Sequence, residues 1–138
     1  MMKACMTTII LATLICSTFA YADPQNSSPD AYSQCVDQTI QKLDLGNINN
    51  AVVEFCSQKT KATYEKQIVA LLDQIKQHSE KYQQPERYKD IMKSQQLWKN
   101  YVDQECKNAG TYIGSPMYAF CPMKEYGTRV EQLTEYAQ

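Results

Sequence analysis

Six cysteines in a chain of 138 residues constrain the fold more than any other feature of the sequence. In an exported protein, cysteines at this density form disulfides that hold a small core together. In a cytosolic protein, they point instead to metal or redox chemistry. The meaning of the cysteines therefore depends on whether the chain leaves the cytoplasm.

Residues 1–22 have the organisation of a secretory signal peptide. An apolar stretch at 6–19 follows the positive charge of Lys3 and ends in Ala20-Tyr21-Ala22. A basic start, a short apolar core and an A-x-A site together predict cleavage after Ala22. We therefore expect a mature chain that is periplasmic or secreted and begins at Asp23.

Two alternatives to cleavage remain open. A transmembrane anchor needs about 20 continuous apolar residues, and this apolar run is shorter. Lipidation would use Cys16, but Ile15 stands where a lipobox has a small residue. With the signal peptide removed, the chain is not expected to span the membrane.

Removal of the signal peptide leaves four cysteines, in two pairs that each flank a predicted turn. Pairing across each turn would close loops of about 15 to 20 residues and stabilise the fold by on the order of 3 kcal/mol per bridge. Crossed pairings stay open. Redox or zinc chemistry is the alternative use of these thiols, but the chain has no C-x-x-C motif and no histidine near them. The expected disulfide cysteines are Cys35, Cys56, Cys106 and Cys121.

The charge balance excludes several classes of function. The chain has 14 basic and 15 acidic residues, and loss of Lys3 with the signal peptide changes the net charge from -1 to -2. This weak field does not attract a phosphate backbone, so nucleic-acid binding is not expected. One histidine cannot build a histidine-rich metal site, and no cofactor is expected.

The rest of the sequence predicts helices. Residues 23–30 are polar and contain two prolines, which is typical of a disordered leader. From residue 31 onward, apolar residues recur at steps of three and four, and strand-like alternation is missing. Gly46 is expected to end the first helix and Asn47 to cap the second. The predicted helices cover 31–45, 48–83, a segment that starts at Pro85 and reaches about 106, and a last segment after a loop at 107–116.

The fold class that follows is all-α. We predict a small four-helix-type domain over 31–138, stapled by two disulfides. Pro122 suggests that the last helix properly begins only after Cys121, because proline interrupts a helix interior.

The third predicted helix carries a resemblance to a known family. Residues 94–106 read SQQLWKNYVDQEC. They resemble the S/A-Q-x-x-W-x-x-Y/F-R-D-x-E-C helix of the LprI lysozyme inhibitor family, and later residues look like its Gly-Ser loop and Thr/Arg stretch. Two departures are the Val102 in place of the usual arginine and a wider spacing between the first two cysteines. The matching positions are Gln95, Trp98, Tyr101, Asp103, Glu105, Gly114, Ser115, Thr128 and Arg129.

Helical spacing predicts that part of this signature faces an apolar seam. The residues predicted to face inward are Gln95, Trp98, Glu105 and Cys106, while Tyr101 and Asp103 flank the seam. A buried glutamine or glutamate must find a hydrogen-bond partner. We interpret the signature as a packing and hydrogen-bonding device, since a binding surface is rarely part of such a seam.

The resemblance implies inhibition of host lysozyme for at least one family member. An inhibitor needs an exposed and rigid element, and the predicted loop at 107–118 is the candidate because a Cys106–Cys121 bridge would hold it. Its expected contacts are Tyr112, Ser115 and Tyr118. The alternative is that Tyr112 and Ile113 fold back onto the core.

Catalysis is not expected. His78 is the only imidazole, and no motif places a serine or cysteine nucleophile beside it. Asp103 and Glu105 are two residues apart and point to different sides of a helix, so they do not form a glycosidase-like pair. We predict an exported protein-binding domain, and the family resemblance implies a lysozyme as its partner. A structural or interaction module of the bacterial envelope, without inhibitory activity, is the alternative.

Overall fold

The computed structural model describes residues 30–138, so the predicted signal peptide and nearly all of the predicted leader lie outside the described residues. The described part of the chain forms four helices and no strand, which confirms the all-α prediction. None of these helices is long and apolar enough to cross a membrane. The helices are α1 (Ala31–Lys42), α2 (Asn50–Lys81), α3 (Pro85–Tyr112) and α4 (Met117–Ala137).

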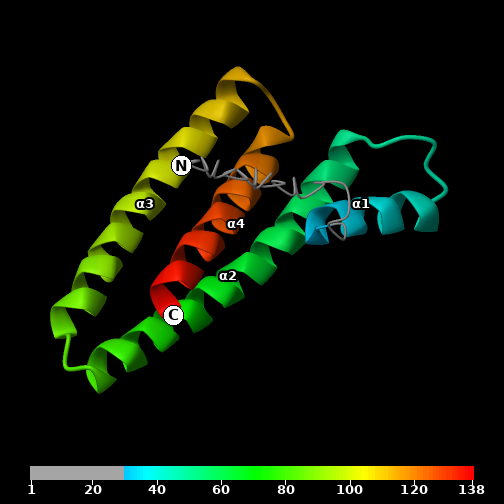
Figure 1. Ribbon diagram of the computed structural model, residues 1–138. Helices are drawn as coiled ribbons and strands as arrows, with labels where there is room; N and C mark the ends of the chain where they lie inside the picture. The colour runs from blue at the N-terminus through cyan, green and yellow to red at the C-terminus, as the bar shows by residue number, and fades with distance from the viewer. Residues whose placement is uncertain (1–29) are drawn as a thin grey trace, which may run out of the picture.

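The long helix α2 organises the domain (Figure 1). α2 and α3 form a hairpin, α4 lies in the space between them, and α1 packs on the first half of α2. The main core runs along the three long helices and includes Ile75, Val102 and Leu133, all almost completely buried. A smaller core surrounds the α1–α2 contact, where Val36 and Val52 are buried. These two cores hold the two ends of α2 to different partners.

Side-chain caps fix the starts of the first two helices. The Asp30 carboxylate accepts hydrogen bonds from the backbone N–H groups of Tyr32 and Ser33, both at 2.9 Å. The Asn49 side chain accepts one from the Val52 N–H at 3.0 Å. Each cap satisfies backbone donors that lack a partner inside the helix.

The connection between α1 and α2 differs from the prediction. Asn47 was expected to cap α2, but Asn49 does so, two residues later. Gly46 was expected to end the first helix, but α1 ends at Lys42, and Asp44 adopts the left-handed conformation with a φ of 51°. Aspartate tolerates this conformation better than most residues, which makes a glycine unnecessary there.

The connection between α3 and α4 is much shorter than predicted. The loop expected at 107–116 is wrong, because α3 continues to Tyr112 and only residues 113–116 separate the two helices. α4 also begins before Cys121, at Met117, and it contains Pro122 in its first half. The start of α3 at Pro85 is confirmed.

Gly110 lies inside α3, where it allows a side chain of α4 to pack closely against the helix. A Cβ atom at position 110 would lie 2.3 Å from ring carbons of Tyr118, which packs against the helix from α4. The glycine is therefore a close-packing position between two helices and does not break α3.

Candidate functional site

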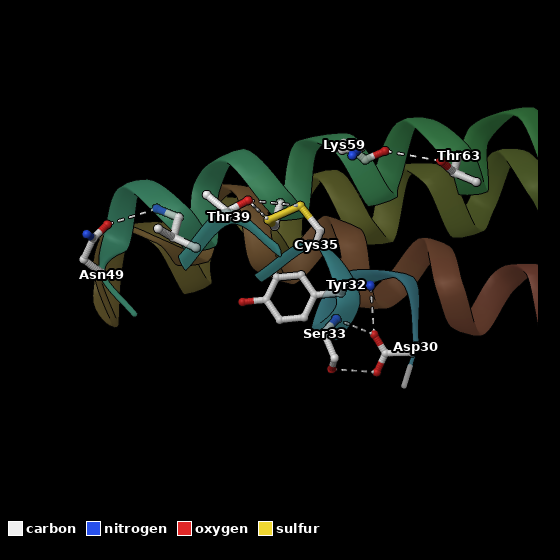
Figure 2. The surroundings of a disulfide bond; sticks show 10 residues. Asp30, Tyr32, Ser33, Cys35, Thr39, Asn49, Lys59 and Thr63 are labelled. Carbon is white, nitrogen blue, oxygen red and sulfur yellow. Dashed lines mark hydrogen bonds between the residues drawn. A yellow bond between two sulfur atoms is a disulfide. The ribbon is translucent and has the colours of Figure 1, made fainter. Parts of the chain in front are cut away.

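The first disulfide joins α1 to α2 through Cys35 and Cys56, as the pairing across the first turn predicted. The two Cα atoms are 5.6 Å apart, which is an ordinary separation for a disulfide. Figure 2 shows Thr39 beside the sulfur atoms, with its hydroxyl 3.6 Å from the Cys56 Sγ. Both cysteines are buried, so this bridge is part of the smaller core.

The second disulfide, between Cys106 and Cys121, joins α3 to α4 near their connection. Its Cα atoms are 5.4 Å apart. Together with the close contact between Gly110 and Tyr118, it holds the ends of the two helices together. The crossed pairings considered from the sequence are excluded by the two observed bridges.

Three signature residues meet around a buried guanidinium group. Arg129 in α4 is only 4% exposed. Its Nε donates to the Gln95 side-chain oxygen at 2.8 Å, and its guanidinium carbon lies 5.6 Å from the centre of the Trp98 ring. Further hydrogen bonds run from Arg129 to the side chains of Gln132 at 3.0 Å and Ser94 at 3.4 Å.

This arrangement gives the signature a structural role. No carboxylate forms an ion pair with Arg129 within residues 30–138, so neutral oxygen atoms satisfy its donors. Burial lowers the pKa of the Arg129 guanidinium below its ordinary value. A buried charge needs such partners because its transfer from water is costly. The predicted hydrogen bond to Gln95 is confirmed, and its partner is Arg129.

Tyr126 extends this cluster toward α2. Its ring packs edge to face on Trp98 with a centroid separation of 5.0 Å, and the Lys61 ammonium group lies 4.5 Å from the centre of the same ring. Contacts of this kind stabilise by about 0.5 to 1.5 kcal/mol beyond the area that they bury. The Lys61 contact was not predicted, because lysine is ordinarily a solvated residue.

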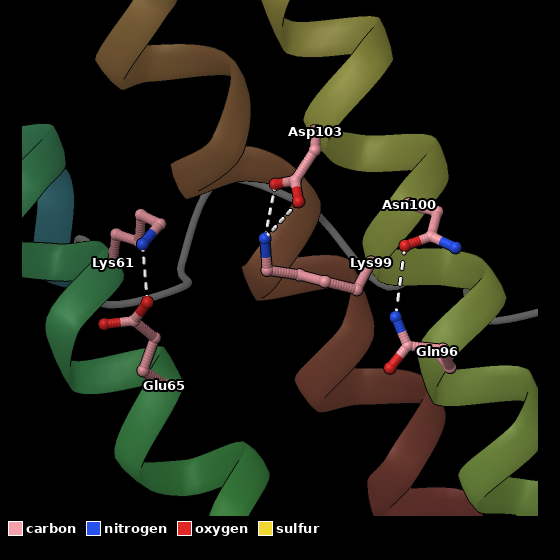
Figure 3. A network of polar contacts seen from close by, with 6 residues as sticks. All are labelled: Lys61, Glu65, Gln96, Lys99, Asn100 and Asp103. Atoms are coloured by element: carbon pink, nitrogen blue, oxygen red, sulfur yellow. Dashed lines mark hydrogen bonds and ion pairs between the residues drawn. The ribbon is translucent and has the colours of Figure 1, made fainter.

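The remaining signature residues do not join this cluster. Glu105 is exposed, so the prediction that it faces inward is wrong, and its neighbour Cys106 occupies the seam instead. Tyr101 and Asp103 are exposed, as expected for residues flanking the seam. Asp103 pairs with Lys99 one turn earlier on α3 (Figure 3). Thr128 and Ser115 are also exposed, and Gly114 has a φ of 116° in the connection between α3 and α4.

The α3–α4 corner, defined here as residues 112–118, carries the most exposed large apolar side chains of the described residues. Tyr112 is 84% exposed and Ile113 is 75% exposed, so neither folds back onto the core. Tyr118 is 59% exposed, and its hydroxyl lies 3.4 Å from the Thr111 hydroxyl. Tyr112, Ser115 and Tyr118 were predicted from the sequence to contact a protein partner. Ile113 was not.

A reactive histidine or a metal site would also indicate a chemical function. His78 lies near the end of α2, where its ring packs edge to face on Tyr82 at 6.2 Å between centroids. Within residues 30–138, no group of three or more metal-ligating side chains is arranged to hold a metal ion. The best-defined exposed feature is therefore the α3–α4 corner.

The chain matches a known protein family. A family model described as "Lysozyme inhibitor LprI" matches residues 46–133, which is more than half of the chain. The match covers α2, α3 and most of α4, including the second disulfide and the Arg129 cluster, but it begins after α1. No curated protein matches the chain. No solved structure matches it either.

Proposed function

The chain belongs to the LprI lysozyme inhibitor family, and from this membership we propose that it binds and inhibits a lysozyme through its α3–α4 corner. The observation that supports this most is the exposure of Tyr112 and Ile113, side by side on a corner held by a disulfide. Large apolar side chains that remain exposed in this way are typical of protein contact surfaces.

The rigidity of the corner favours binding. The connection between the helices has only the residues 113–116. Next to it, the Cys106–Cys121 bridge joins α3 to α4. A preorganised element loses little conformational entropy when it binds, so more of its contact energy appears as affinity. Tyrosine adds contact area with few rotatable bonds, which keeps that entropy cost low.

The shape of the corner also suits a partner with a cleft. Figure 1 places the α3–α4 connection at one end of the molecule, on the side away from the α2–α3 turn. A projecting pair of helix ends can enter or cover an active-site cleft. Inhibition of this kind requires no catalytic group in the inhibitor, which agrees with a family of inhibitors.

The location proposed for the protein is outside the cytoplasm. Two disulfides and membership of a lysozyme inhibitor family support an extracytoplasmic protein. We propose, more specifically, that residues 1–22 are a signal peptide cleaved after Ala22 and that 23–30 form a leader to the helical domain. The processed chain would then be periplasmic or secreted, with a net charge of -2 that weakly complements a cationic lysozyme.

A lysis assay tests the proposal. The processed protein is mixed with c-, g- and i-type lysozymes in turn, and the clearing of a peptidoglycan suspension is followed. We expect slower clearing with at least one lysozyme type, in proportion to the protein added. Unchanged clearing for all three at micromolar excess would contradict inhibition and favour the alternative, an interaction module of the envelope without inhibitory activity.

A further inference from the structure

A pocket of about 300 Å³ lies between α2, α3 and α4, next to the second disulfide. Its polar lining consists of three lysines and one aspartate, and its remaining walls are apolar or aromatic. Tyr118 lines the pocket and also belongs to the α3–α4 corner. The charged lining residues are Lys61, Lys99, Lys107 and Asp103.

The charges of the pocket are not balanced. Asp103 is already engaged by Lys99, and Lys61 turns toward Glu65, which is outside the lining (Figure 3). Lys107 has no ion pair within residues 30–138. Glu65 and Asp103 thus compensate two of the three ammonium groups, and Lys107 leaves a local excess of one positive charge, although the whole chain has a net charge of -1. The local excess of positive charge is complementary to an anion.

The walls strengthen the attraction. Val102, Cys106 and Tyr126 are buried side chains that form the inner walls of the pocket. Charges beside such low-dielectric walls interact more strongly than charges in open solvent. The hydrogen bond to Asp103 raises the pKa of Lys99, so this lysine stays protonated at any physiological pH.

We propose that this pocket binds a carboxylate, supplied in the complex by an aspartate or glutamate side chain of the lysozyme seated on the α3–α4 corner. The inference rests on the proposed function, because it names the partner group that the same surface would meet. Tyr118 connects the two features, since a partner that contacts this side chain on the corner also reaches the mouth of the pocket. The Lys107 ammonium group supplies the charge for this carboxylate.

The first experiment tests the pocket without any lysozyme. The ¹⁵N-labelled processed protein is titrated with sodium acetate at constant ionic strength, with sodium chloride as the reference salt. We expect saturable shifts of the Val102, Lys107 and Tyr118 amide signals, absent from the Lys107→Met variant. The matched control is Lys93→Met, which removes an exposed lysine of the same helix outside the pocket and should leave the shifts intact. Shifts that do not saturate, or that saturate with inorganic phosphate only, would overturn carboxylate binding.

The second experiment tests the source of the carboxylate. The affinity of the inhibited lysozyme is measured for the unmodified protein, for Lys107→Met and for Lys93→Met at two salt concentrations. We expect Lys107→Met to weaken binding by about threefold to tenfold, with a smaller salt dependence, and Lys93→Met to change neither. Equal affinities of the two variants would overturn the lysozyme as the source.

The failure of the two proposals can be told apart. Acetate binding together with no lysozyme binding contradicts the proposed function and the partner, while the carboxylate pocket stands. Lysozyme inhibition without a saturable acetate site contradicts the pocket and leaves the proposed function in place.

Discussion

The packing of Tyr118 on Gly110 provides a sharp test of how the α3–α4 corner is built. Replacing Gly110 with alanine has two opposing effects. Alanine stabilises a helix interior by about 1 kcal/mol relative to glycine, because it restricts the unfolded chain and forms helix more readily. The added Cβ, however, would lie 2.3 Å from the Tyr118 ring, a distance at which the ring must move.

The energetic cost of the clash between the added Cβ and the Tyr118 ring follows from the same geometry. A normal contact between two carbon atoms is about 3.5 to 4.0 Å, so the ring must retreat by more than 1 Å. Overpacking of this kind costs about 1 to 3 kcal/mol, either as strain or as lost ring contacts. We therefore expect Gly110→Ala to leave the free energy of unfolding unchanged or to lower it by up to about 2 kcal/mol.

In a protein that also carries Tyr118→Ala, the ring that clashes with the added Cβ is gone. There, Gly110→Ala should stabilise the protein by the full helix-propensity gain of about 1 kcal/mol. The difference between the two backgrounds is a coupling energy of about 1 to 3 kcal/mol.

Urea unfolding followed by circular dichroism, with the disulfides intact, measures all four proteins. A change of 1 kcal/mol moves the midpoint by about 0.3 to 1 M urea, which is easily resolved. Gly46→Ala is the matched control, because no atom lies within 4 Å of a Cβ built at that position, and its effect should be the same in both backgrounds. Equal stabilisation by Gly110→Ala with and without the Tyr118 ring would refute the close packing described here.

Three further predictions concern the rest of the domain. Arg129→Met should lower the free energy of unfolding by about 1 to 3 kcal/mol in urea titrations, because it leaves the half-buried side-chain oxygen of Gln95 without its donor. Replacing Cys35 and Cys56 together with serine should cost about 3 kcal/mol and should raise amide hydrogen exchange first in α1. Burial, with two nearby carboxylates, raises the pKa of Tyr64 above 10.0, so the folded state holds this proton more tightly than the unfolded state. Stability should therefore fall as the pH rises through about 10, and Tyr64→Phe should reduce the slope of urea midpoint against pH.

Local sequence patterns predicted much of the fold. The three- and four-residue spacing of apolar side chains identified all four helices, and Pro85 marked the start of α3 correctly. The two disulfides followed from cysteines on either side of predicted turns. These features depend on residues close together in the chain, where periodicity and turn chemistry are informative.

Two of the errors, at Gly110 and Glu105, arose where a distant residue decides the structure. Gly110 lies in the segment predicted as a loop, but its role is set by the ring of Tyr118, which belongs to the next helix. Glu105 was assigned to the seam from spacing alone, whereas the packing of α3 against α4 selects Cys106 and Gly110. Each error is a case in which packing between helices overrides a local preference.

The candidate site was predictable only in part. The resemblance identified Gln95, Trp98 and Arg129, but sequence spacing cannot show that the last is buried against the first two, because 34 residues separate Arg129 from Gln95. The pocket likewise combines lysines from α2 and α3 with tyrosines from α4. Exposure of Tyr112 and Ile113 was one of two alternatives until the structure placed them in solvent.

We propose that a lysozyme contacts the molecule at its α3–α4 corner. The most direct measurement compares inhibition constants for two double variants, Tyr112→Ser with Ile113→Ser, and Val69→Ser with Leu97→Ser. The second pair removes apolar side chains that are also exposed, at 69% and 62%, but lie on α2 and α3 away from the corner. The corner variant should inhibit at least tenfold more weakly, since a hot-spot side chain contributes about 2 kcal/mol or more and 1.4 kcal/mol is a factor of ten. The control variant should inhibit like the unmodified protein. Equal inhibition by both variants would contradict a lysozyme contact at the α3–α4 corner.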